Sequence, residues 1–136
     1  MTNFISISVS VNTNAEKAWA YWTTPKHIIN WNHASDEWQT PRATVDLKVG
    51  GHFMSRMEAK DGSFGFDFTG EYITIEPLTL IEYVMPNGRT VKIEFKTVEN
   101  QTEISQTFQA EDENSLEMQR QGWQAIMNNF KQYVEA

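Results

Sequence analysis

The C-terminal stretch of the chain, residues 114–134, constrains the fold most, because its apolar side chains recur at the spacing of one helical face. These residues are Leu116, Trp123, Ile126, Met127, Phe130, Tyr133 and Val134. Asn114 suits the N-cap position, and Glu117 suits the positive end of the helix dipole. At about 1.5 Å per residue, such a helix is roughly 30 Å long. Its apolar face needs a broad cover, which the preceding chain must supply.

The N-terminal part of the chain predicts one strand followed by two short helices. Residues 4–11 alternate between apolar and polar side chains, which is typical of a strand with one solvated face. A capping-box pattern at residues 13–16 begins the first helix, and Thr24 before Pro25 ends it. Pro25 also suits the first position of a second helix, which we expect to reach Trp31.

The middle of the chain predicts a meander of strands after a polar loop at residues 33–44. The expected strands are residues 45–49, 52–59, 64–75, 80–85, 91–96 and 104–108. Asp61-Gly62 and Asn87-Gly88 are strong signals for tight hairpins. Consecutive strands joined by tight turns form an antiparallel sheet, and its apolar face must be buried. We therefore expect a single α+β domain over residues 1–136, with a seven-stranded curved sheet wrapped around the C-terminal helix and a cavity between them.

Charge and composition narrow the possible partners. Eighteen acidic residues against eleven basic residues give a net charge of −7, which disfavours nucleic acid and anionic membranes as partners. The absence of cysteine excludes disulfides, thiolate catalysis and zinc–sulfur sites. No secretory signal and no apolar run of about 20 residues is visible. We expect a cytoplasmic protein without a cofactor, and a homodimer remains open.

Several segments resemble one protein superfamily, in the right order along the chain. Residues 15–19 (AEKAW) and 24–31 (TPKHIINW) resemble the first two helices of the START-like, or SRPBCC, superfamily. Residues 46–58 (DLKVGGHFMSRME) and 68–77 (FTGEYITIEP) are similar to the central signature of one branch, and residues 122–130 resemble its C-terminal helix. That branch is the bacterial group homologous to the C-terminal domain of the activator of the heat shock protein 90 ATPase.

The resemblance implies a helix-grip fold, which is shared with plant pollen allergens and lipid-transfer domains. It also implies a cavity that binds a hydrophobic or aromatic small molecule. Two alternatives remain open. One is a cyclase, dehydratase or hydrolase that uses the same cavity. The other is a chaperone-activator-like interaction module that uses an exposed sheet face or edge. We expect this alternative to be weakened, because the eukaryotic activator engages the chaperone through a separate N-terminal domain and residues 1–136 resemble only its C-terminal domain.

The aromatic side chains are the main candidates for a ligand-binding wall, because five Trp and eight Phe are many for this length. The candidate ligand-binding residues are Trp22, Trp31, Trp38, Phe53, Ser55, Phe66, Phe68, Tyr72, Phe95, Phe108, Trp123, Met127 and Phe130. Each aromatic residue could instead be ordinary core, and the surplus of Trp favours a cavity. Trp38 is the strongest single candidate, because an indole in a polar loop needs an apolar partner. We expect Ser55, Tyr72, Thr97 and Gln106 to point inward, as ligand anchors or bonded to water.

The titratable residues form no catalytic or metal-binding pattern. The three histidines are His27, His33 and His52. They form no i,i+4 pair, and we expect them on the solvated surface. Alternation places Asp67 and Glu71 on the outer sheet face, although a bulge near Gly70 would turn Glu71 inward. We therefore expect neither a catalytic acid–base pair nor a metal site.

Overall fold

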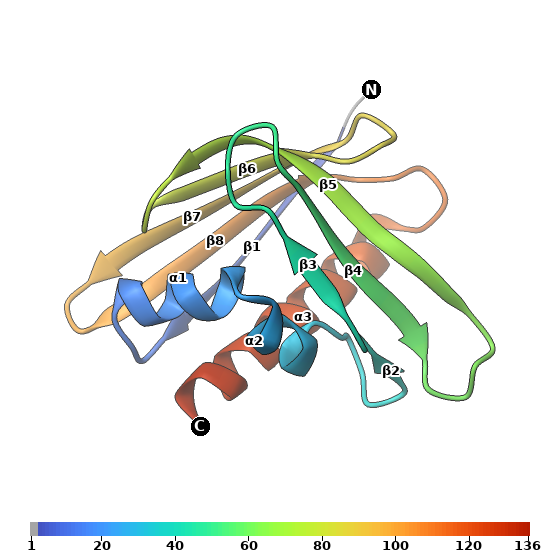
Figure 1. Ribbon diagram of the computed structural model, residues 1–136, viewed down its shortest axis with the longest axis horizontal. Coiled ribbons are helices and arrows are strands. Elements are labelled where there is room, and N and C mark those ends of the chain that lie inside the picture. The colour runs from blue at the N-terminus through green and yellow to red at the C-terminus, as the bar shows by residue number, and fades with distance from the viewer. Residues whose placement is uncertain (1–2) are drawn as a thin grey trace.

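The computed structural model describes residues 3–136, and in it one antiparallel sheet curls around a long helix (Figure 1). Met1 and Thr2 lie outside the described residues. The elements are β1 (Phe4–Val11), α1 (Ala15–Thr23), α2 (Pro25–Trp31), β2 (Trp38–Gln39), β3 (Ala43–Val45), β4 (His52–Ala59), β5 (Gly65–Glu76), β6 (Leu80–Val84), β7 (Thr90–Val98), β8 (Gln101–Gln109) and α3 (Leu116–Glu135). The expected α+β helix-grip fold is confirmed.

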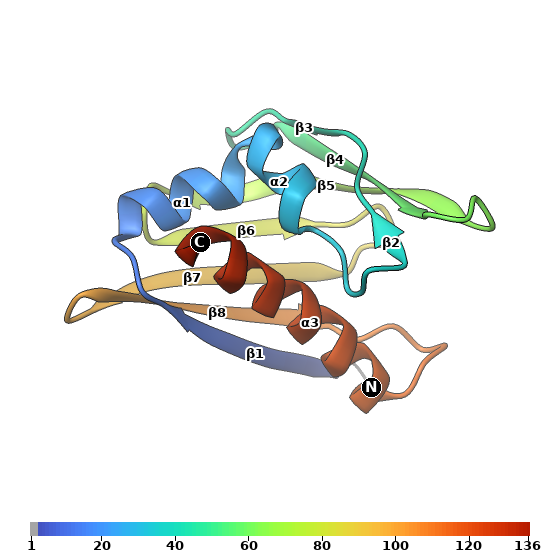
Figure 2. The same cartoon turned by 90° about the horizontal axis from the view of Figure 1, so that it is seen from below.

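The sheet has the strand order β1-β8-β7-β6-β5-β4-β2, and β3 also pairs with β4. The hairpins β4–β5, β5–β6, β6–β7 and β7–β8 form a meander, and β1 extends it by pairing with β8. Figure 2 shows α3 running along the β1 and β8 side of the sheet, whereas α1 and α2 lie nearer to β3 and β7. The helices therefore cover the concave face unevenly.

The strands differ from the sequence prediction in the segment between α2 and β4. Residues 3–136 form eight strands and not seven, because the two-residue strand β2 lies in the segment predicted as a loop. The predicted strand at residues 45–49 is wrong: β3 ends at Val45, and a tight turn follows. In this turn Asp46 donates its N–H to the carbonyl of His52, and Gly50 has a φ of 85°, which favours glycine.

The predicted helix caps are each displaced by one residue. Asn14 caps α1, since its side-chain oxygen accepts the N–H of Lys17 at 2.8 Å. Ser115 caps α3 in place of Asn114, since its hydroxyl accepts the N–H of Met118 at 3.1 Å. In both places two good capping residues are adjacent, so composition alone does not choose between them.

The inner face of α3 begins later than its apolar pattern indicated. Met127, Phe130 and Val134 are buried, but Leu116 is 46% exposed. Gln119 is buried instead. Its amide accepts the N–H of Glu111 and donates to the carbonyl of Asn114, both at 2.9 Å, and so fixes the turn before the helix. No helix of residues 3–136 is both long and apolar enough to span a bilayer.

Candidate ligand-binding site

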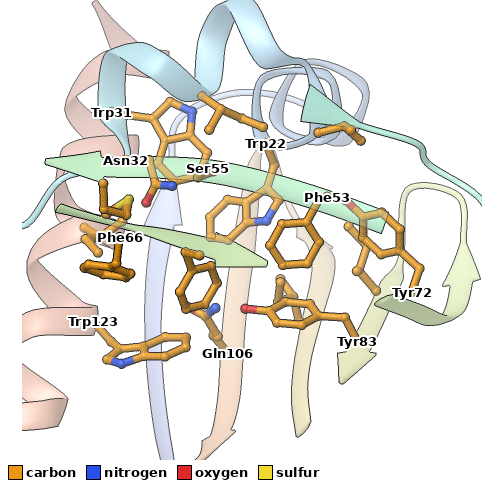
Figure 3. A pocket seen from close by; sticks show the side chains of 17 residues that line it. Trp22, Trp31, Asn32, Phe53, Ser55, Phe66, Tyr72, Tyr83, Gln106 and Trp123 are labelled. Carbon is orange, nitrogen blue, oxygen red and sulfur yellow. The ribbon is translucent and has the colours of Figure 1, made fainter. Parts of the chain in front are cut away.

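A cavity of about 250 Å³ lies between the concave face of the sheet and the three helices (Figure 3). It is lined by Trp22, Ile28, Trp31, Asn32, Val45, Phe53, Ser55, Met57, Phe66, Phe68, Tyr72, Ile81, Tyr83, Ile93, Gln106, Trp123 and Ile126. These residues come from every helix and from β3 to β8. The cavity is therefore a property of the whole fold and not of one loop.

The cavity exists because α3 does not extend over β4 and β5. α3 packs along β1, whereas β4 and β5 lie at the far side of the sheet (Figure 2). Small residues on their concave face add space. Ser55 on β4 is one, and Gly70 on β5 is another, where a Cβ atom would lie 2.5 Å from Cε2 of Phe53 and 2.9 Å from Cδ1 of Tyr83. Gly70 thus lets these two rings approach the sheet closely.

Eight of the 17 residues that line the cavity are aromatic. Trp22 and Trp31 pack with their centroids 4.9 Å apart, and Phe53 meets Tyr83 edge-on at 4.7 Å. On the α3 side the indole of Trp123 stacks on Phe108, with 3.9 Å between centroids and 9° between planes. These contacts hold the indoles and rings in fixed orientations, so the wall does not depend on a ligand to form it.

The polar groups in the cavity are few and uncharged. Ser55, Tyr72 and Gln106 are buried and line the cavity, as predicted. Tyr83 is also buried there, and Asn32 lines the cavity as a half-buried residue. Burial raises the pKa of Tyr72 to about 12 and raises the pKa of Tyr83 further, so both hydroxyls stay protonated. Thr97 was expected here but is exposed. The 17 lining residues include no Asp, Glu, His, Lys or Arg.

Eight of the thirteen candidate residues line this cavity. They are Trp22, Trp31, Phe53, Ser55, Phe66, Phe68, Tyr72 and Trp123. Four others are instead buried in the core: Phe95 and Phe108 lie on the sheet against Trp19 of α1 and Trp123 of α3, and Met127 and Phe130 belong to α3 itself. Trp38 does not line the cavity either; it packs against Phe64 and Phe66, with centroids 6.1 and 6.3 Å away, on the surface beside it.

The sequence prediction of site residues missed Tyr83 and several aliphatic residues. Tyr83 follows Ile81 by two positions, so the alternation of β6 could have assigned it to the concave face. Ile28 and Asn32 give no such signal, since Ile28 lies within α2 and Asn32 caps it, and this helix is too short for a clear periodicity. Ile93 and Ile126 are indistinguishable from core residues in the sequence.

His27 is not on the solvated surface as expected. It is half-buried, with its ring stacked on Tyr21 at 3.8 Å and its Nδ1 atom 2.7 Å from the Tyr133 hydroxyl. Burial, followed by the charge of Lys26, lowers the pKa of His27. The imidazole therefore joins α1, α2 and α3 outside the cavity. His33 is also half-buried, and only His52 is exposed, 3.4 Å from Glu71.

The outer face of the sheet holds the remaining charged candidates. Asp67 and Glu71 are exposed, as predicted. The strand does contain a bulge, but it lies between Tyr72 and Thr74, after Glu71, and does not turn that carboxylate inward. Among residues 3–136, no three His, Cys, Asp or Glu side chains gather closely enough to hold a metal ion.

A curved antiparallel sheet that holds a C-terminal helix over an aromatic cavity defines the START-like, helix-grip class of domain. The family model described as "Activator of Hsp90 ATPase homolog 1-like protein" matches residues 12–135. The chain belongs to this family.

Solved structures agree with the assignment. A solution structure of an AHSA1-like protein from Aeromonas hydrophila is 42% identical, with a TM-score of 0.87 over 96% of this chain and 92% of that one. A protein from Cytophaga hutchinsonii is 46% identical, with a TM-score of 0.85 over 96% and 91%. A Chromobacterium violaceum protein shares the fold at 17% identity, with a TM-score of 0.85 over 98% of each chain. No curated protein matches the chain.

Proposed function

We propose that this protein binds a hydrophobic, aromatic small molecule in the cavity between the sheet and α3. The observation that carries the proposal is that Trp22, Trp31 and Trp123 all face one space that no side chain of the protein fills. Indoles normally bury their large surface against other groups, and mostly apolar concave sites with a few polar groups are typical of small-molecule binding. We further propose a cytoplasmic location, in line with the sequence-based expectation.

The enzymatic alternative required an inward Asp, Glu or His close to Trp31 or Trp123. The lining contains none, and its two tyrosines have raised pKa values, which makes them poor proton donors and acceptors near neutral pH. The chaperone-type alternative would use a different surface. Its best candidate is the exposed aromatic group of Trp38, Phe64 and Phe66, in which Phe64 is 60% exposed.

The proposal is tested by filling the cavity from the sheet. Ser55→Leu places an isobutyl group where a buried hydroxyl lies on the cavity floor, and Ser8→Leu makes the same change on the exposed face of β1. We expect native mass spectrometry of protein purified from its own host to detect a bound small molecule in the wild type and in Ser8→Leu, but not in Ser55→Leu.

Calorimetry with naphthalene is the second arm of the test. It does not require the natural ligand to stay bound to the protein during purification. The same order of binding is expected: wild type and Ser8→Leu bind, and Ser55→Leu does not. If Ser55→Leu binds as well as the wild type, the ligand lies elsewhere. If the wild-type protein binds nothing in either arm, the proposal is wrong.

A further inference from the structure

We infer that the ligand is a neutral, flat molecule of about two aromatic rings that carries one carbonyl or hydroxyl group, and that this group meets Gln106 and Tyr83. The inference rests on the proposed function and specifies its ligand. It follows from three features of the cavity: polar groups without partners, among them this pair, a lining without charge, and a size that fits few ring systems.

The first feature is the pair of polar side chains on the cavity floor. Gln106 lies on β8 between Ile93 on one neighbouring strand and Ile7 on the other. Tyr83 lies on β6, opposite Val91. Both residues are only 6% exposed, and the Tyr83 hydroxyl and the Gln106 amide point into the cavity (Figure 3).

Neither group forms a hydrogen bond with any residue of the described chain, and the same is true of Ser55 and Tyr72 on the same lining. The buried polar side chains of Thr40, Thr102 and Gln119, which lie outside the cavity, are all bonded to the protein. Buried amides and hydroxyls are nearly always bonded, to protein, to water or to a ligand. A carbonyl or hydroxyl on the ligand can satisfy both at once. The carbonyl would accept from the hydroxyl and from the amide NH₂, whereas a hydroxyl could also donate to the amide oxygen.

The second feature is the absence of charge. A carboxylate or an ammonium group moved from water into this cavity loses its hydration, and no lining residue supplies an opposite charge. The protonated tyrosines can donate hydrogen bonds but cannot neutralise a cation. A neutral ligand avoids this cost, so the cavity selects against charged analogues of the same shape.

The third feature is the size and shape of the space. An apolar cavity of about 150 Å³ is known to hold benzene. The cavity of about 250 Å³ therefore has room for roughly two rings. Its walls include aromatic rings, among them the indole of Trp123, whose other face stacks on Phe108. A flat aromatic ligand makes the largest contact with such rings.

Four probes of one ring system separate these features. They are naphthalene, 2-acetylnaphthalene, 2-naphthol and 2-naphthoate. Calorimetry on the wild-type protein at neutral pH should give affinities for 2-acetylnaphthalene and 2-naphthol about tenfold above naphthalene, which corresponds to one net hydrogen bond. We expect 2-naphthoate to bind at least tenfold more weakly than naphthalene.

Two near-isosteric variants assign the preference to the polar pair. Tyr83→Phe and Gln106→Leu should each lose most of the tenfold preference, measured within each variant as the ratio of its affinity for 2-acetylnaphthalene to its affinity for naphthalene. Thr107→Val is the matched control. Its hydroxyl lies next to Gln106 in sequence but bonds Ser6 on the outer face, so the preference should stay. Gln106→Leu should also keep or raise the melting temperature, a result that a purely structural amide would not give.

Each outcome decides the matter. If naphthalene binds as tightly as its acetyl and hydroxyl derivatives, the polar pair does not recognise the ligand and the inference is wrong, while the proposed function stands. Preference for 2-naphthoate would overturn the neutral class. Failure of all four probes to bind would overturn this inference, and together with the absence of a bound molecule in protein from its own host it would overturn the proposed function itself. If Gln106→Leu does not fold, Tyr83→Phe alone tests whether the polar pair recognises the ligand.

Discussion

The concave face of the sheet has two halves whose sequences look alike and whose interiors differ. In the filled half, β1 and β8 present residues such as Ile5, Ile104 and Phe108, and all three are fully buried. In the open half, β4, β5 and β6 present Phe53, Ser55, Phe68 and Tyr83, which border the cavity. Both halves show the same alternation of inward and outward side chains.

The two halves differ in the helices that pack over them and not in the pattern of their strands. Met127, Phe130 and Val134 of α3 are fully buried in the half where α3 packs along β1. The open half is covered by the half-buried indoles of Trp22 and Trp123, which line the cavity but do not fill it. The stability of the domain should therefore reside mainly in the filled half, and the binding of small molecules in the open half.

The largest effect is expected from the centre of the filled half. Phe130 has no exposed surface and packs edge-on against Trp22 and Trp31, at 4.9 and 5.0 Å. Phe130→Ala should lower the free energy of unfolding by about 3–5 kcal/mol, measured by urea denaturation. A loss below about 1 kcal/mol would mean that the two halves do not differ as described.

Trp123→Ala should cost less, although the removed side chain is larger. The indole already borders a void on one side, so its removal creates less new unfilled space. We expect a loss of about 2–3 kcal/mol, because the cost of such truncations depends on the cavity they leave. Affinity for naphthalene should fall in the same variant. Unchanged stability together with unchanged binding would show that Trp123 is neither core nor wall.

Gly70→Ala adds an atom to the open half, whereas the two preceding variants remove atoms. The new Cβ would contact Phe53 at 2.5 Å, so that ring must move. Crowding of this kind costs about 1–3 kcal/mol, and the displaced ring should also reduce ligand binding. Gly122→Ala on α3 is the control. No atom lies within 4 Å of its Cβ position, and alanine should stabilise the helix by up to about 1 kcal/mol.

The smallest effect concerns His27, which belongs to neither half. Its pKa is lowered in the folded state, so the unfolded chain binds a proton more readily. The stability that neutral His27 supports is complete above pH 6.5 and is lost as the pH falls through the lowered value. When the pH is lowered from about 7.5 to about 5, the melting temperature of His27→Gln should therefore drop less than that of the wild type, because histidine titrates in this range. Equal drops in the melting temperatures of the two proteins would show that His27 does not contribute to the pH dependence of stability.

The sequence predicts much of this architecture but not the division of its interior. The order of strands and helices and the inward phase of Phe53, Ser55 and Phe68 follow from alternation and turn residues. Phe108 shows the same alternation as Phe53, yet one is core and the other cavity wall. The difference arises from the path of α3, which depends on tertiary packing.

Two further residues show where local patterns are insufficient. Leu116 continues the apolar stripe of α3, but Gln119 is buried in that turn because its amide bonds the preceding backbone. Trp38 has the apolar partners that its loop position indicated, but they are Phe64 and Phe66 at the surface and not the cavity. In both cases the decisive contact comes from a segment that periodicity does not describe.

The five tryptophans provide the most direct measurement of the central claim, that ligand binds in the open half. Trp22, Trp31 and Trp123 line the cavity, whereas Trp19 packs edge-on against Phe95 and Trp38 lies in the surface group. In ¹H–¹⁵N spectra recorded during titration with 2-acetylnaphthalene, the indole N–H signals of the first three should shift, and those of Trp19 and Trp38 should change much less. Shifts confined to Trp38, or no shift in the three cavity indoles, would contradict the account.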